Sequence, residues 1–360
     1  YSSAASDVYK RQHISFGAVN SEGIIDNNKY NRYNFTFRNS WDIVKNVLSM
    51  DMGLFYIKQN NQNSNGQGMY YNPLVPIYLF PPSDDINKYA VYERYDADRN
   101  FKTQYWPYGN QGLGMQNPYW IINRNMFNTD RDRYIISLSM KWNITNWLNI
   151  IGRARIDNAY TDFERKLYAS TDGLFAKSQG NYMNQEDKNT STYLDFLVNV
   201  DKKFGENYHL LVNLGGSFYD EKYKSDTFEG NLVGVPNFFH PSNIPSTESN
   251  YNKSELHTQT QSIYGKAEIG YRNFLYADVT GRIDWFSTLV GTSKEYVCYP
   301  SAGLSVILSE ILPLPEKIIS FWKIRGSYAQ VGNPPSAYLP YATVALENGL
   351  SLIHISEPTR

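Results

Sequence analysis

Hydrophobic and polar residues alternate with a period of two over long stretches of the chain. The alternation is clear at 30–39, 47–57, 133–142, 192–202 and 274–286. In the third stretch the apolar set is Tyr134, Ile136, Leu138, Met140 and Trp142, and the polar set includes Arg133, Ser137, Ser139 and Lys141. Strict alternation of this kind predicts β-strands that carry one apolar face and one polar face.

The length of these stretches separates two kinds of β-protein. They run over about 10 to 13 residues, whereas strands of soluble proteins most often have about 5 or 6. A strand that crosses a membrane needs about 9–11 residues. The pattern therefore favours membrane-crossing strands, whose polar face keeps the mean hydropathy of the chain low.

The connections between the stretches alternate in length. Short links are expected near 40–46, 143–146, 203–207, 272–273 and 309–318. Long ones are expected near 59–132, 159–191, 220–257 and 287–298. In an up-and-down barrel this alternation places the long loops on one rim and the short turns on the other, as in outer-membrane barrels. The predicted fold class is all-β, an antiparallel up-and-down transmembrane β-barrel with about 12 sequentially linked strands between His13 and Glu347.

Aromatic residues make up 16% of the chain, and several flank the short links. The pairs are Trp142 and Trp147, Phe204 and Tyr208, and Tyr271 and Phe274. Amphipathic rings at a headgroup boundary form the aromatic girdles of membrane barrels. The alternative is that tyrosine and tryptophan are simply good strand formers, but repetition at the short-link end favours a girdle.

Charge and cysteine content exclude several classes of function. The formal net charge of −1 shows no bias toward nucleic acid, so we expect no nucleic-acid partner. A single cysteine, Cys298, excludes an internal disulfide and a cysteine-based zinc site. No run of 18 apolar residues occurs, so no transmembrane helix is expected.

Catalytic and metal-binding patterns are weak. The five histidines lack zinc-ligand spacing, and no nucleophile elbow, P-loop or dinucleotide motif occurs. His209 lies near several serines, as a barrel phospholipase would need, but nothing locates a nucleophile. The acidic pairs Asp84–Asp85, Asp96–Asp98 and Asp130–Asp132 are better explained as solvated loop charge than as calcium sites. We therefore expect no cofactor, no metal and no enzymatic activity.

Several segments resemble the SusC/RagA family of TonB-linked outer-membrane proteins. They are EGIIDNNKYNRYNF at 22–35, NPLVPIYLFPPSDD at 72–85, GMQNPYWIINRN at 114–125, SIYGKAEIGYRNFLYADVTGRIDWFSTL at 262–289, YPSAGLSVILSE at 299–310 and KIRGSYAQVGN at 323–333. The last three, in this order, are specific to the family. The resemblance covers about residues 13–347.

This resemblance implies a plugged barrel of about 22 strands in the bacterial outer membrane, of which the chain holds about 12. Such a barrel works with a SusD-like surface lipoprotein and imports oligosaccharides or peptides with energy from TonB. We expect the TonB-contacting region and the plug to lie outside this sequence. The competing interpretations are a passive outer-membrane porin and a secreted all-β carbohydrate-binding module.

Two groups of residues are candidates for contact with cargo. The first is a set of loop aromatics, and its members are Tyr70, Tyr71, Trp106, Tyr108, Tyr119 and Trp120. Their rings can stack on sugars, or they can pack the loop on itself or on the partner lipoprotein. The second set is predicted to line the lumen, and its members are Arg153, Arg155, Asp157, Asp278, Arg282 and Asp284. These charges can line the transport path, or pair with one another or with the plug.

The two ends of the sequence look different from the rest. Residues 1–12 and 351–360 resemble translated adapter sequence, and residues 1–12 have no apolar core of a signal peptide. We expect both to be non-native tails, so that the barrel portion spans 13–350 and the natural protein continues on both sides.

Overall fold

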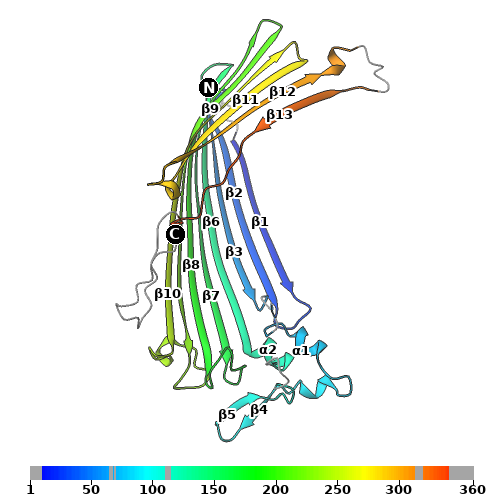
Figure 1. Ribbon diagram of the computed structural model, residues 1–360, viewed down its shortest axis with the longest axis vertical. Helices are drawn as coiled ribbons and strands as arrows, with labels where there is room; N and C mark the ends of the chain where they lie inside the picture. The colour runs from blue at the N-terminus through cyan, green and yellow to red at the C-terminus, as the bar shows by residue number, and fades with distance from the viewer. Residues whose placement is uncertain (1–9, 65–67, 69, 110–114, 313–318, 340–360) are drawn as a thin grey trace, which may run out of the picture.

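The fold comes from a computed structural model that describes residues 10–64, 68, 70–109, 115–312 and 319–339. Its main feature is one antiparallel sheet of 11 strands, each paired with its neighbours along the chain (Figure 1). The strands are β1 (Lys10–Glu22), β2 (Lys29–Val44), β3 (Leu48–Gln62), β6 (Asn125–Asn143), β7 (Leu148–Tyr168), β8 (Gly180–Phe204), β9 (Tyr208–Asn231), β10 (Ser249–Tyr271), β11 (Leu275–Phe286), β12 (Tyr296–Ile307) and β13 (Lys323–Ala329). The sequential order confirms the predicted up-and-down antiparallel fold.

The register gives the sheet one apolar face that is exposed rather than packed. On β6 this face carries Ile136, Leu138 and Met140, which are 38–40% exposed, and on β8 it carries Phe196, which is 52% exposed. On β6 the apolar run lasts from Tyr134 to Trp142, which is about 27 Å along an extended strand. Once the strands are tilted, a band of this length fits the hydrophobic layer of an outer membrane. We call it the apolar band.

The strands continue well beyond the apolar band. β8 has 25 residues and β9 has 24, more than twice what a membrane crossing needs. In the extra length the outward face becomes charged, for example at Asp130 and Asp132 on β6, so both faces are polar. Alternation disappears there while the backbone ladder continues.

The predicted loops at 159–191 and 220–257 were therefore too long. Residues 169–179 connect β7 to β8, and residues 232–248 connect β9 to β10. The first and last parts of each predicted loop belong to paired strands.

Tight turns close one end of the sheet, at 45–47, 144–147, 205–207 and 272–274. Arg272 and Asn273 both have positive φ, 47° and 59°, which the two-residue hairpin turns with the right twist require. Trp142 and Trp147 lie at this end and are exposed. Short turns lie at the top of Figure 1 and the longest connections at the bottom, as the alternating link lengths predicted.

The described residues of the longest connection, 63–124, form a folded lobe that we call the loop lobe. It contains α1 (Leu74–Tyr78), η1 (Ile86–Tyr89), a small sheet of β4 (Glu93–Asp96) and β5 (Phe101–Gln104), and α2 (Pro118–Arg124). α2 begins at Asn117, whose side chain accepts from the Tyr119 amide at 2.8 Å. The largest fully buried apolar side chains, Trp120, Leu167 and Leu232, lie at this end of the molecule.

No helix within the described residues is long and apolar enough to cross a membrane. The prediction of non-native tails falls mostly on residues 1–9 and 351–360, which lie outside the described residues. Lys10, Arg11 and Gln12 belong to β1 and pair with Trp41, Ser40 and Asn39 of β2.

Candidate functional site

The face opposite the apolar band carries the charges. On β7 it holds Arg153, Arg155 and Asp157, and the register carries the same face across β8, β9 and β10. It reaches Asp278, Arg282 and Asp284 on β11, where Ser262 of β10 pairs with Asp284. All six residues predicted to line the lumen thus lie on one face, which we call the charged face.

Ion pairs connect most of these six residues. Asp157 binds Arg133 of β6 through both oxygens, at 2.7 and 2.6 Å, and Arg155 at 2.9 Å. Arg282 contacts Asp284 at 2.6 Å. Asp278 lies across from Gly303, where an added Cβ would meet its carboxylate at 2.6 Å. Pairing within the set, one of the roles left open by the sequence, therefore describes Arg155, Asp157, Arg282 and Asp284.

Asp195 of β8 forms a second hub on the charged face, and the sequence did not single it out. Its side chain is fully buried, and it accepts from Arg153 at 2.6 Å and from the Tyr193 hydroxyl at 3.1 Å. The Tyr264 hydroxyl of β10 donates a short third bond. A buried carboxylate is stable only when donors satisfy it, so this network fixes the spacing of β7, β8 and β10.

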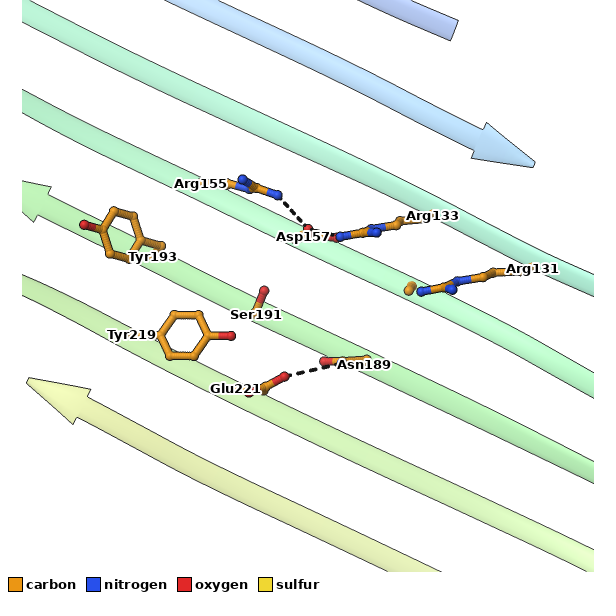
Figure 2. Close-up of a pocket in the computed structure, with 10 residues that line it drawn as sticks. Arg131, Arg133, Arg155, Asp157, Asn189, Ser191, Tyr193, Tyr219 and Glu221 are labelled. Atoms are coloured by element: carbon orange, nitrogen blue, oxygen red, sulfur yellow. Dashed lines mark hydrogen bonds and ion pairs between the residues drawn. The ribbon is translucent and has the colours of Figure 1, made fainter. Parts of the chain in front are cut away.

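A hollow of about 400 Å³ opens on the charged face between β6 and β9, next to the Asp157 pairs. We call it the arginine hollow, and its lining residues are Arg131, Arg133, Arg155, Asp157, Ala159, Asn189, Ser191, Tyr193, Tyr219 and Glu221. In Figure 2 Arg133 and Arg155 approach Asp157 from opposite sides, while Asn189 faces Glu221. A second hollow of about 590 Å³ lies closer to the short turns, shares Arg155 and adds Arg38 and Arg153.

Arg131 was missed because the sequence analysis placed residues 59–132 in a loop, and Arg133 was assigned to the polar face of 133–142 but was not included among the candidate lumen residues. Extending the parity of Ser137 and Ser139 backwards along β6 puts both arginines on the charged face. The even difference in residue number between each arginine and Ser137 was therefore the sequence signal that could have placed both arginines on this face.

The loop lobe contains an aromatic cluster around one carboxylate. Asp84 accepts from Lys88 at 2.7 Å, from Tyr89 at 2.6 Å and from Tyr108 at 2.7 Å. These bonds hold the pKa of the Asp84 carboxyl well below its usual range, and the bond to Asp84 raises the pKa of Tyr89. Trp106 packs edge-on against Tyr89 and Tyr108, with ring centroids 5.3 Å apart in both contacts.

The other predicted loop aromatics connect the lobe to the rest of the molecule. Trp120 is 1% exposed and donates to Thr171 at 3.0 Å. Tyr70 and Tyr71 pack on Phe175, with centroid distances of 5.0 and 4.9 Å. Burial raises the pKa of Tyr71 to about 12. Tyr119 is partly exposed at the start of α2. Packing of the loop on itself thus accounts for the contacts of Trp120, Tyr70 and Tyr71.

The acidic pairs considered as calcium sites take donors from the protein itself. Asp85 accepts from the Asn87 amide and Asp96 from the Asp98 amide, both at 3.0 Å. Asp130 accepts from Asn60 at 2.7 Å, and Asp132 bonds to Tyr56 and Lys58. His209 contacts Asp201 at 2.7 Å near the short turns. These contacts are those of surface charges in local hydrogen bonds.

Residues 78–352 match the family profile described as "TonB dependent receptor-like, beta-barrel". A comparison with curated proteins finds no match. Among solved structures, the RagAB peptide importer in its "open-open" state matches with a TM-score of 0.67 and 14% identity, over 89% of this chain and 34% of that one. The RagAB peptide transporter matches with a TM-score of 0.65 and 14% identity, over 89% and 35%.

The open form of the ferric-catecholate import receptor Fiu from E. coli K12 matches with a TM-score of 0.50 and 11% identity, over 83% of this chain and 48% of that one. Identities this low show a shared fold. The chain spans about a third of the length of the RagAB chains that it matches. The expected resemblance to barrels of the SusC/RagA type is confirmed in fold.

Proposed function

Since the chain belongs to the TonB-dependent receptor-like β-barrel family, we propose that it forms part of the wall of an importer for oligosaccharides or peptides. Barrels of this family lie in the outer membrane of Gram-negative bacteria, so the apolar band faces lipid and the charged face lines the lumen. The barrel portion is proposed to span residues 13–350.

One observation carries this proposal, namely the opposite character of the two faces. The exposed apolar residues form a band one membrane thick, while the other face carries ion pairs and two hollows of about 400 and 590 Å³. A wall that only sealed a membrane would need no hollows lined by charged groups. A polar lumen with binding positions along it is what stepwise passage of a polar cargo needs.

The partners are part of the proposal. The similarity to the RagAB peptide importer supports a SusD-like lipoprotein over the loop rim and a peptide or an oligosaccharide as cargo. TonB would contact the protein through a region outside this sequence. The partly exposed Tyr119 and the ring cluster of Trp106 and Tyr108 are proposed to contact cargo or the lipoprotein where they reach the surface.

Long-read sequencing of the full-length gene and its neighbours gives the first test. A signal peptide, a plug domain and an adjacent gene for a SusD-like lipoprotein would support the importer. A gene that ends near residues 12 and 350, with no plug and no partner gene, would contradict it.

Uptake by cells that express the full-length protein gives the second test. Uptake of fluorescent oligosaccharides and peptides should stop when TonB is deleted or when a protonophore collapses the proton gradient. Uptake that continues without TonB would indicate a passive porin instead.

A further inference from the structure

We propose that the arginine hollow is an oxyanion subsite that holds a carboxylate group of the cargo, so that the importer favours carboxylate-bearing oligomers over neutral ones. The inference rests on the proposed import function and names the chemistry of the cargo at one place on the charged face.

Arg131 is the residue that points to a ligand. From β6 to β11, the five other arginines whose side chains share the charged face each pair with a carboxylate, and they are Arg133, Arg153, Arg155, Arg165 and Arg282. Arg38 of β2, on the same face, packs over the ring of Phe55 instead. Arg131 has no ion pair within the described residues, and its Nε is buried without a hydrogen-bond partner. Its cross-strand neighbours are Gln59 and Thr161, neither of which carries a charge. A guanidinium without a carboxylate partner has an unbalanced charge, and an oxyanion bound in the hollow would pair with it.

The surrounding groups leave a positive charge in the hollow. Three guanidinium groups, those of Arg131, Arg133 and Arg155, stand against the two carboxylates of Asp157 and Glu221. Both oxygens of Asp157 are already taken by Arg133 and Arg155. Glu221 accepts a long contact of 3.4 Å from the Asn189 amide and also interacts with the Tyr219 hydroxyl, so it does not pair with Arg131. The net charge of the lining is +1, and the unpaired cation is Arg131, which runs beside Arg133 in Figure 2.

Size and shape favour a carboxylate on a sugar or an amino-acid side chain. A volume of about 400 Å³ lies within the range of small-molecule pockets and has room for one residue of an oligomer. The planar fork of a guanidinium matches the two oxygens of a carboxylate. Ser191 and Tyr219, which also line the hollow, offer hydroxyl groups to the rest of the cargo residue. The second hollow continues the arginine lining through Arg38 and Arg153, so a carboxylate that leaves the first site meets further cations.

Binding of matched ligand pairs to the full-length transporter tests the proposal. One pair is trigalacturonate and its methyl ester, and the other is triglutamate and triglutamine, so the two pairs distinguish a glycan from a peptide as the source of the carboxylate. Isothermal titration with the detergent-solubilised protein should show at least one acidic ligand binding about tenfold or more tightly than its neutral partner. Arg131→Gln should weaken acid binding by about ten- to a hundredfold, the range for a lost charge-assisted hydrogen bond.

Lys141→Gln is the matched control. Lys141 lies on the same strand and the same face as Arg131, is exposed and does not line the hollow. Its loss removes the same charge from the lumen and should leave acid binding within about twofold. Arg131→Lys keeps the charge but loses the planar fork, and it should bind acid with intermediate affinity. It also replaces Arg131→Gln as the test if that variant fails to fold, as judged by heat-modifiable migration on a gel.

Three outcomes would overturn the inference. They are equal binding of acid and neutral partners by the wild type, an Arg131→Gln variant that binds acid like Lys141→Gln, and an Arg131→Lys variant indistinguishable from the wild type. TonB-dependent uptake of neutral ligands alone would refute the carboxylate subsite and leave the proposed importer standing. Loss of TonB dependence for every ligand would refute the importer itself.

Discussion

Gly215 of β9 lies beneath the ring of Tyr264, and replacing it with alanine tests the account of the charged face. The two residues are cross-strand partners, and the tyrosine ring crosses the glycine on its way to Asp195. A Cβ at position 215 would lie 2.7 Å from two carbons of the ring and 2.9 Å from the Phe196 carbonyl oxygen. The carbonyl belongs to the β-ladder and has little freedom to move, so the ring must shift and its bond to Asp195 is lost.

The expected cost follows from three contributions. Overpacking of this kind costs about 1–3 kcal/mol, and a hydrogen bond to a charged acceptor contributes about 1.5–3 kcal/mol. Replacing glycine by alanine in a strand returns about 0.5–1 kcal/mol. Gly215→Ala should therefore lower the free energy of unfolding by about 1.5–5.5 kcal/mol.

Denaturant unfolding of the full-length barrel in lipid vesicles, followed by tryptophan fluorescence, measures this difference. Gly281→Ala is the control, because a Cβ at position 281 meets no atom within 4 Å, and it should be neutral or slightly stabilising. In a Tyr264→Ala background the clash with the ring disappears and only the contact with the Phe196 carbonyl oxygen remains, so Gly215→Ala should cost clearly less there. If Gly215→Ala is as stable as Gly281→Ala in the native background, the packing of Tyr264 over Gly215 is wrong.

Three further predictions concern the loop lobe. The bonds from Lys88 and two tyrosines lower the pKa of Asp84, so the stabilising effect of the ionised carboxylate is complete above the unfolded pKa of about 3.9 and is lost as the pH falls through the lower folded pKa. Limited proteolysis should therefore cut residues 80–108 faster at pH 3 than at pH 7. Asp84→Asn should abolish this difference. Trp120→Ala should destabilise the lobe by about 3–5 kcal/mol, since the side chain is 1% exposed, and unchanged hydrogen exchange in the lobe would contradict an anchoring role. Tyr71→Phe should leave the melting temperature unchanged or raise it, because the buried hydroxyl has no hydrogen-bond partner within the described residues; a clear drop would reveal a partner.

How well the sequence predicted a strand depended on what its two faces touch. At 274–286 one face belongs to the apolar band and the other to the charged face, and the structure has β11 at Leu275–Phe286. At the other extreme, the alternation begins at residue 192, whereas β8 begins at Gly180. Residues 184–191 lie beyond the apolar band and are all polar, and Tyr182 is buried against Leu232 and Ile244. No alternation therefore arises, although both neighbouring strands pair with this part of β8. The hydropathy pattern of a strand shows whether the surroundings of each face are apolar or polar, and it carries no information about the backbone hydrogen bonds between strands.

The site shows the same division. The period of two was enough to place Arg153 and Asp284 on a common face, because parity survives any error in strand length. Which residues they pair with depends on the register between strands, so the contact of Arg153 with Asp195, 42 residues away in the sequence, could not be predicted. Burial inside the loop lobe was equally hidden, since Tyr78 is 84% exposed and Trp120 is 1% exposed although both are aromatic residues of one segment. Tertiary packing decides such differences, and no local pattern encodes it.

The spacing of residues along a strand explains why several charges of the charged face pair across strands, in addition to the pairs of Arg155 with Asp157 and Arg282 with Asp284 along one strand. Every second residue within the band must be apolar, so lumen charges on one strand can follow one another only at intervals of two residues, about 7 Å. Arg131 and Arg133 on β6, like Arg153 and Arg155 on β7, are like charges at this spacing and repel one another. Relief has to come from a neighbouring strand only about 4.8 Å away, as Asp195 does for Arg153 and Asp157 for Arg133. A one-residue slip in register would turn each of these charges to the opposite face of the sheet, so the register that keeps the apolar band on one face also keeps the arginine hollow in shape and Arg131 on the charged face.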